Sequence, residues 1–308
     1  MSGAHLYPDS ERFLVLLNPG AGGRTAEPET LRRRLGGAFA ARGVPFDIVE
    51  AENSEAGLDV TRRAAERGYR AIVAAGGDGT VSVALRGVAG TSVPVAIVPF
   101  GTANQLALNF DIPTSLEDSV RVAVEGRVTK IDLAEANGET FALMAGAGLD
   151  AQVMADATTE LKSRLGFGAY IYSGLKNVIN RPGADFRITA DDQEVEVKAS
   201  MVLVANAGQL GAGPLPVEFR MAPGASFQDG LIDVCIYAPS NLPEVARIIW
   251  RVTRNRFSGD DKIIYFQARS VRIEADPPVA IEIDGDPRGE TPMEAKVSPL
   301  AARIIVPR

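Results

Sequence analysis

Short apolar runs alternate with amphipathic stretches over the first third of the chain. The expected strands cover 13–17, 46–49, 71–75 and 95–98, and the expected helices cover 29–41, 55–67, 81–88 and 102–108. Continuous apolar runs of this length are typical of strands buried on both faces of a parallel sheet. The pattern therefore predicts an α/β domain with helices on both faces of the sheet and right-handed crossovers.

The pattern changes near Gly126 to closely spaced strands with turn residues between them. The expected strands cover 128–135, 140–145, 185–190, 194–205, 262–267, 270–274, 279–283 and 302–306, with helices at 152–162, 167–180 and 243–255. Such spacing favours an antiparallel β-sandwich or barrel. Because 308 residues exceed the usual size of one core, we expect two domains, 1–127 and a β-rich 128–298.

The composition excludes several kinds of binding partner and active site. The net charge of −7 and the pI near 5.0 argue against a nucleic-acid partner, because binding phosphates needs a basic surface. Cys235 is the only cysteine, which excludes an intrachain disulfide and indicates a reducing compartment. His5 is the only histidine, so histidine triads and histidine-rich metal sites are excluded.

The sequence gives no sign of a secretion signal or a membrane span. The N-terminal residues lack the basic and apolar regions of a signal peptide, and no uncharged apolar run reaches the length of a bilayer. We therefore expect a cytoplasmic protein, soluble or peripheral at the membrane.

Three glycine-rich loops each follow an expected strand. They are Asn-Pro-Gly-Ala-Gly-Gly at 18–23, Gly-Gly-Asp-Gly-Thr at 76–80 and Pro-Phe-Gly-Thr-Ala-Asn at 99–104. Glycines let the backbone approach a phosphate, and the helix that follows adds its positive dipole end. Each loop alone is equally well explained as a turn that begins a helix. Three loops at one carboxyl edge of a parallel sheet favour a ligand site, although no P-loop motif is present.

These loops resemble those of the diacylglycerol kinase catalytic family, which includes bacterial lipid kinases, sphingosine kinases and ceramide kinases. The resemblance continues in order along nearly the whole chain. The later motifs are G-A-G-L-D-A at 146–151, K-S-R-L-G-F-G-A-Y at 162–170, D-G-L-I-D-V at 229–234 and I-D-G-D-P at 283–287.

The resemblance implies ATP and Mg²⁺ as cofactors and assigns roles to residues. The ATP-binding residues would be Asn18, Gly77, Asp78, Gly79, Thr80, Gly101, Thr102 and Asn104. Asp286 would accept the acceptor's proton, with Asp78 also catalytic, and Asp229 would bind Mg²⁺ with the carbonyls of Ser226 and Leu231. The resemblance further implies that a segment of about 299–308 returns to the nucleotide-binding domain, and that the acceptor enters between the domains.

The chain departs from the family pattern at several positions. Ser82 and Val83 stand where relatives have asparagine and glutamate, and no threonine occurs near Ala51. Asp286 stands where many relatives have glutamate, which shortens the side chain but keeps the carboxylate. Taken alone, Asp284-Gly285-Asp286 is better explained as a hairpin turn.

Three functions remain open at this stage. The first is an ATP-dependent lipid kinase, the second a kinase of NAD type, and the third a lipid-binding relative without catalysis, which only Ser82 and Val83 favour. The acceptor could be diacylglycerol, a sphingoid base, a glycerophospholipid or a polyprenol. A strand edge would support a homodimer. The arginines of 243–255 favour transient membrane contact, or simply a solvated helix face.

Overall fold

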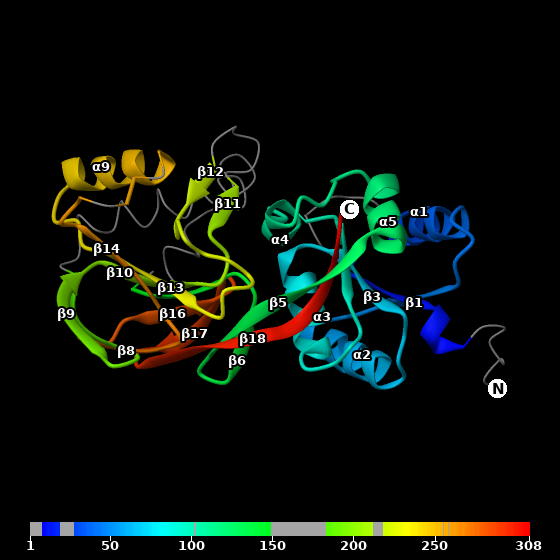
Figure 1. The fold of residues 1–308 in the computed structure, drawn as a ribbon, viewed down its shortest axis with the longest axis horizontal. Coiled ribbons are helices and arrows are strands. Elements are labelled where there is room, and N and C mark those ends of the chain that lie inside the picture. The colour runs from blue at the N-terminus through cyan, green and yellow to red at the C-terminus, as the bar shows by residue number, and fades with distance from the viewer. Residues whose placement is uncertain are drawn as a thin grey trace. The chain divides into compact units, whose positions relative to one another are not determined.

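The structure of the protein is a computed structural model. The structure describes residues 8–18, 28–101, 103–148, 183–211, 218–254, 256–257 and 259–308. The chain divides into two compact units (Figure 1). The first comprises 1–131 with 300–308, and the second comprises 132–299.

The first unit is built on four neighbouring parallel strands in the order β2-β1-β3-β4. Every residue of β1, β3 and β4 is buried, as the continuous apolar runs predict, whereas the edge strand β2 is partly exposed. The elements described here are η1 (Asp9–Glu11), β1 (Phe13–Leu17), α1 (Pro28–Ala40), β2 (Phe46–Glu50), α2 (Ser54–Glu66), β3 (Ala71–Gly76), α3 (Asp78–Val88), β4 (Val95–Pro99), α4 (Gln105–Asn109) and α5 (Leu116–Glu125).

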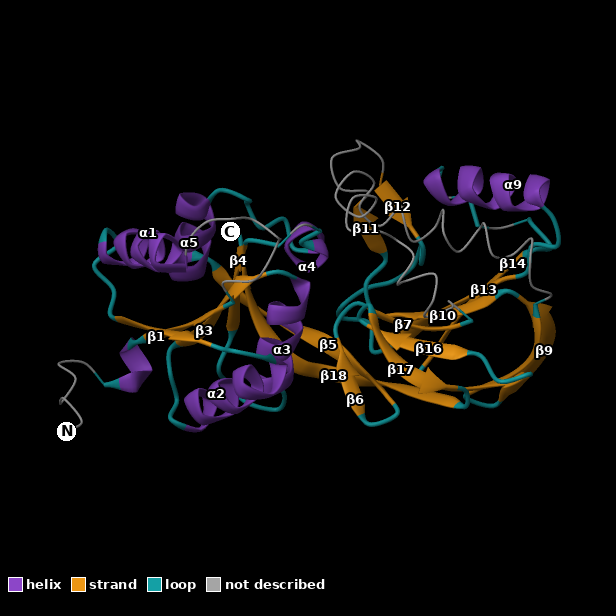
Figure 2. Cartoon of the chain, turned by 180° about the vertical axis from the view of Figure 1, so that it is seen from behind, coloured by secondary structure: helices purple, strands orange, loops and turns teal. Residues whose placement is uncertain are grey.

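Helices cover both faces of this sheet. Figure 2 shows α1 and α5 on one side of β1 and β3, and α2 and α3 on the other. Side-chain caps define the helix starts: Asn53 accepts a hydrogen bond from the Ala56 N–H, and Ser115 accepts one from the Asp118 N–H. This arrangement brings the carboxyl ends of β1, β3 and β4 to one edge of the sheet.

The second unit is rich in antiparallel strands. One sheet has the order β14-β13-β10-β7-β16-β17, and β15 pairs with β18 and β8, with β9 at the edge. The remaining elements are β5 (Arg127–Ala136), β6 (Glu139–Phe141), β7 (Met144–Ala147), β8 (Ala184–Ala190), β9 (Gln193–Ala199), β10 (Met201–Ala205), β11 (Gln209–Gly211), β12 (Glu218–Arg220), β13 (Ile232–Tyr237), α9 (Leu242–Thr253), β14 (Ile263–Ala268), β15 (Ser270–Asp276), β16 (Ala280–Ile283), β17 (Asp286–Glu290) and β18 (Met293–Val306).

Alternate residues of both sheets fill the core of the second unit. Ile188 and Ile273 come from one sheet, and Val204, Val234 and Ile281 come from the other. All five are at most 1 % exposed. Two sheets that share one apolar core form a sandwich, so the predicted fold class, an α/β region followed by a β-rich sandwich-like region, is confirmed.

Two details differ from the sequence-based expectation. The single strand expected over 194–205 is two strands, because Ser200 separates β9 from β10 and these lie in different sheets. The last strand is longer than expected: β18 pairs with β15 near its start, and its Ile304 pairs in parallel with Val95 of β4. The helices expected at 152–162 and 167–180 lie outside the described residues. Within the described residues, no helix has both the length and the apolar character to cross a bilayer.

Candidate functional site

The loop after β3 forms the first turn of a helix. Gly77 is the N-cap of α3, and its carbonyl accepts hydrogen bonds from the N–H groups of Thr80 and Val81, at 3.0 and 3.1 Å. The helix begins at Asp78, three residues before the expected start. Asp78, Gly79 and Thr80 therefore occupy the first turn of α3, where backbone N–H groups and the helix dipole favour a negative charge.

The loop after β4 packs directly against it. The Phe100 N–H donates to the Gly76 carbonyl at 2.8 Å. A Cβ placed on Gly101 would lie 2.5 Å from the Gly77 Cα and 2.7 Å from Asn104 Oδ1, which is closer than real Cβ atoms approach. The two loops thus touch backbone to backbone, and Gly101 is required by this contact. Thr102 lies outside the described residues.

Asn104 and Asp78 hold the second loop in place. Asn104 has a φ of 48°, in the left-handed region, and its Nδ2 donates to the Gly101 carbonyl at 2.7 Å. Asp78 is half-buried, and its Oδ1 accepts a hydrogen bond from the Leu106 N–H at 2.9 Å, at the start of α4. The carboxylate to which the family resemblance assigns a chemical role therefore also fixes the geometry of the two loops.

Two buried polar atoms at this place lack a hydrogen-bond partner within the described part of the chain. They are Thr80 Oγ1 and Asn104 Oδ1. A buried group left unpaired costs about 1–3 kcal/mol. The Thr80 hydroxyl is a donor that could bind a phosphate oxygen, whereas Asn104 Oδ1 can only accept.

Asn18 brings the first glycine loop to the same edge. It follows β1, the neighbour of β3, and its N–H donates to the Ala75 carbonyl at 3.1 Å. The remainder of that loop, 19–27, lies outside the described residues. The structure therefore brings together Asn18, Gly77, Asp78, Gly79, Thr80, Gly101 and Asn104 at the carboxyl edge of β1, β3 and β4.

Asp286 begins β17 in the second unit, directly after a tight turn. Asp284 and Gly285 form this turn with φ angles of 48° and 89°. The Asp286 side chain is 70 % exposed, and Arg288 pairs with it at 3.3 Å and with Glu139 at 2.8 Å. The turn agrees with the hairpin alternative, and its exposed carboxylate remains available to a ligand.

Asp284 has a separate, structural role that the sequence did not reveal. Its carboxylate accepts hydrogen bonds from the N–H groups of Ala142, Leu143 and Met144, at 2.9 to 3.1 Å. Three backbone donors on one carboxylate anchor the turn to the segment before β7. The first aspartate of Asp284-Gly285-Asp286 thus holds the turn, and the second is left exposed.

Glu282 is a buried carboxyl group two residues before this turn. It is 5 % exposed on β16. Burial, and after it the charges of Asp284 and Asp286, raise the pKa of Glu282 to about 7. Sequence reasoning missed this residue, although a glutamate among the isoleucines of an expected strand was a visible signal.

The predicted metal ligands lie in the turn before β13. Asp229 is exposed, and its two oxygens accept hydrogen bonds from the Leu231 N–H at 3.0 Å and Gln267 Nε2 at 3.2 Å. Ser226 lies in the same turn and accepts a hydrogen bond from the Gln228 N–H at its Oγ, at 3.2 Å. A carboxylate combined with the backbone carbonyls of such a turn would be a hard-oxygen donor set of the kind that suits Mg²⁺.

Two further carboxylates, which the sequence analysis did not assign, lie around this turn. Asp132 is fully buried and accepts a hydrogen bond from the Gly230 N–H at 2.8 Å. Burial raises the pKa of Asp233, whose carboxylate accepts hydrogen bonds from the Tyr265 hydroxyl and from Gln267. In the described ranges, no group of three or more histidine, cysteine or acidic side chains could hold a metal.

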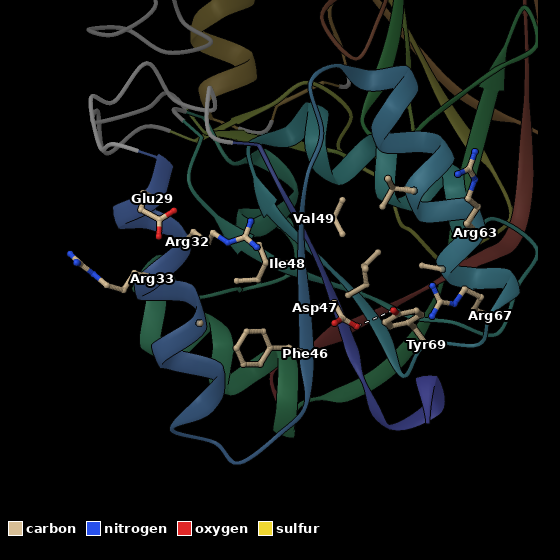
Figure 3. Close-up of a pocket in the computed structure, with 14 residues that line it drawn as sticks. Glu29, Arg32, Arg33, Phe46, Asp47, Ile48, Val49, Arg63, Arg67 and Tyr69 are labelled. Atoms are coloured by element: carbon tan, nitrogen blue, oxygen red, sulfur yellow. Dashed lines mark hydrogen bonds between the residues drawn. The ribbon is translucent and has the colours of Figure 1, made fainter. Parts of the chain in front are cut away.

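A separate groove follows the exposed edge of β2 (Figure 3). It has a volume of about 770 Å³ and is bordered by Arg32 and Arg33 of α1, by Arg63 of α2 and by Arg67, the residue after α2. Arg32, Arg63 and Arg67 pair with Glu50, Asp59 and Asp9 respectively. Its charge is thus largely balanced, and none of the predicted site residues lines it.

Comparison with known families matches both units. The diacylglycerol kinase catalytic domain matches residues 12–136. The YegS C-terminal NAD kinase beta sandwich-like domain matches residues 144–306, which is more than half of the chain. The two matches follow one another in the order that the sequence motifs predict.

Individual relatives cover nearly the whole chain at low identity. A diacylglycerol kinase of Staphylococcus saprophyticus is 25 % identical over 92 % of this chain and 91 % of its own length. An uncharacterized protein of Synechocystis is 28 % identical over 95 % of this chain and 70 % of its own. The crystal structure of a candidate diacylglycerol kinase from Bacillus anthracis superposes with a TM-score of 0.81 at 24 % identity, covering 96 % and 97 %, which supports the fold.

Proposed function

Because the chain belongs to the diacylglycerol kinase catalytic-domain family, we propose that it transfers the γ-phosphate of ATP to the hydroxyl of a lipid. The family makes the chain a kinase. Diacylglycerol is the first acceptor to test, since several relatives carry the name diacylglycerol kinase. The observation that carries the proposal is the backbone contact between Gly77 and Gly101, which joins two glycine loops at a helix N-terminus.

The nucleotide phosphates would bind at these loops. A Cβ built on Gly79 would meet no atom within 4 Å, so the backbone there is open to a ligand. The first turn of α3 supplies N–H donors, and the Thr80 hydroxyl is a further donor without a partner in the described residues. Phosphoryl transfer depends mainly on positioning and charge neutralisation, which such loops provide.

Asp286 would accept the proton of the attacking hydroxyl. It is an exposed carboxylate held by a turn whose other aspartate, Asp284, is fixed by three backbone donors. A carboxylate within hydrogen-bond reach of the acceptor can take its proton as the oxygen attacks the γ-phosphorus. Arg288 pairs with both Asp286 and Glu139, and these two ion pairs restrain the orientation of the Asp286 side chain before the acceptor binds.

Mg²⁺ would be held by Asp229 with the carbonyls of Ser226 and Leu231. When bound, the ion would supply positive charge that favours the anionic groups of the reaction. The residues fit this role through the exposed Asp229 carboxylate and its hydrogen bonds to Leu231 and Gln267, which fix its orientation. Gln267 also bonds to the buried Asp233, so the turn is linked to β13 and β14.

An acceptor panel tests this function. ADP release from Mg·ATP would be measured with micelle-dispersed diacylglycerol, a sphingoid base, a glycerophospholipid and a polyprenol, and with NAD. We expect ADP release with one lipid class and none with NAD. Release with NAD alone would overturn the lipid-kinase proposal in favour of a NAD kinase. Failure with every acceptor, despite a folded protein that binds lipid, would favour the lipid-binding alternative.

A further inference from the structure

Helix α9 of the second unit (Figure 2) buries the side chains of one side and exposes those of the other. Val245, Ile248 and Val252 are buried, at 3 to 7 % exposure. The opposite side presents an exposed stripe at the spacing of a helix face, which consists of Ala246, Arg247, Trp250 and Arg254. The buried side accounts for the stability of the helix, but it does not explain an exposed tryptophan.

Trp250 is the only tryptophan of the chain and is 49 % exposed. The guanidinium of Arg256 lies over its ring, 5.5 Å from the ring centroid. Tryptophan is enriched at membrane–water interfaces, and interfacial helices combine such an aromatic residue with basic side chains. Its apolar ring suits the region of the lipid headgroups, and its indole N–H can still bind water there.

The charge around this helix has the opposite sign to that of the whole chain. Residues 241–262 carry five cationic side chains and three carboxylates, a net charge of +2, whereas the chain carries −7. The buried carboxylate of Asp260 is paired with Arg247 at 3.1 Å and with Arg251 at 3.3 Å. Arg254 and Arg256 are exposed, and no carboxylate pairs with either among the described residues. Their charge is available to an anionic partner.

We propose that the exposed face of α9, centred on Trp250 and flanked by Arg254 and Arg256, binds the surface of anionic lipid bilayers. The purpose of this membrane binding rests on the proposed function, because a lipid kinase must reach an acceptor that resides in a membrane. A shallow helix face with one aromatic ring and exposed arginines suits a fluid lipid surface, and charge complementarity selects anionic headgroups.

The single tryptophan makes the test direct. The full chain would be titrated with vesicles of phosphatidylcholine containing phosphatidylglycerol, and with vesicles of phosphatidylcholine alone, while Trp250 fluorescence is recorded. We expect a saturable blue shift and protection from acrylamide with the anionic vesicles. The effect should weaken as salt is raised, because salt screens exposed charges. Unchanged emission and full acrylamide access at saturating anionic lipid would overturn the proposal.

Matched arginine variants test where the binding occurs. Arg254→Gln/Arg256→Gln should weaken vesicle affinity at least tenfold, since each basic residue near an anionic surface contributes roughly fivefold. The control is Arg33→Gln/Arg63→Gln, which removes the same charge from two exposed arginines of the first unit. We expect this control to bind as the wild type does. An equal loss in both variants would assign the binding to overall charge and would overturn a role for α9.

An activity assay separates this proposal from the kinase proposal. With a short-chain acceptor dissolved as monomers, Arg254→Gln/Arg256→Gln should turn over at the wild-type rate. With the acceptor embedded in anionic vesicles, its rate should fall at least tenfold. An equal fall in both assays would overturn a role confined to the membrane surface. If the wild type phosphorylates no lipid, the kinase proposal fails, whereas the fluorescence titration still decides whether α9 binds bilayers.

Discussion

The Oδ1 atom of Asp78 accepts a hydrogen bond from the backbone N–H of Leu106 at 2.9 Å. This bond links the first turn of α3 to the start of α4, so one carboxylate connects the two helices that follow the glycine loops. Together with the contact between Gly77 and Gly101, it defines the geometry of the proposed nucleotide site. The side chain to which the family resemblance assigns a chemical role is thus also part of the framework.

Substitution of Asp78 should separate these two roles. Asp78→Ala removes the acceptor from the Leu106 N–H and should lower the free energy of unfolding by about 1 kcal/mol. Asp78→Asn keeps an acceptor oxygen and should unfold near the wild-type urea midpoint. If the negative charge serves catalysis, Asp78→Asn should nonetheless lose most of its kcat. Wild-type kcat in Asp78→Asn would restrict the residue to its structural role.

Two glycine substitutions should differ in their effect on stability. Gly79→Ala adds a methyl group in open space within a helix and should leave the melting temperature unchanged or slightly higher. Gly101→Ala forces the loop away from Gly77 and should lower it. Both should weaken ATP binding, measured by calorimetry. Wild-type ATP affinity in Gly79→Ala would contradict a close approach of the phosphates to this backbone.

Burial of Glu282 predicts a pH dependence of stability. Its pKa is raised to about 7, so the folded protein keeps a proton that the unfolded chain releases at lower pH. The folded protein therefore has its full stability below the ordinary pKa of a glutamate, and it loses stability as the pH rises from there to about 7. Relative to the wild type, Glu282→Gln should gain stability as the pH rises through this range, by about 1.4 kcal/mol per pH unit, and the difference should level off above it.

The control for Glu282 is the same substitution at an exposed position. Glu290 is exposed on β17, the strand that pairs with β16. Urea unfolding from pH 4 to 9 would be measured for Glu290→Gln beside Glu282→Gln and the wild type, to separate the effect of the buried site from that of the substitution itself. A constant difference between Glu282→Gln and the wild type across this range would show that Glu282 is not neutral in the folded protein.

The proposed Mg²⁺ ligand can be tested without measuring activity. Mg²⁺ should raise the melting temperature of the wild type above its value in EDTA, because a ligand that binds only the folded state stabilises it. Asp229→Asn should remove this rise. Asp261→Asn is a matched control, since Asp261 is 78 % exposed and lies outside the turn. An undiminished rise in Asp229→Asn would place the ion elsewhere.

The sequence predicted those parts of the fold whose pattern is local. Continuous apolar runs identified β1, β3 and β4, and the glycines after them identified the loops at one sheet edge. It missed the break at Ser200, because an alternating strand and a buried strand adjoin there with a single serine between them. It also missed the length of β18, since Pro299 lacks an N–H donor and Leu300 has a φ of 50°.

The contacts between distant segments could not be read from the sequence. Asp284 binds the N–H groups of Ala142 to Met144, about 140 residues away along the chain. Nothing near Asp284 distinguishes this anchoring role from that of an ordinary Asp-Gly turn. The same holds for the approach of Gly101 to Gly77, which depends on the pairing of β3 with β4.

Phosphoryl transfer to a lipid hydroxyl, with Asp286 as proton acceptor, is the central proposal for this protein. The most direct measurement is mass spectrometry of micelle-dispersed diacylglycerol after incubation with Mg·ATP and wild type, Asp286→Asn or Asp185→Asn. Asp185 is a matched control because its side chain is 71 % exposed, against 70 % for Asp286. We predict that wild type and Asp185→Asn add one phosphoryl group to the lipid, and that Asp286→Asn does so at least a hundredfold more slowly. Equal product from Asp286→Asn and wild type would contradict the proposed role of Asp286, and unmodified lipid with the wild type would contradict diacylglycerol as the acceptor.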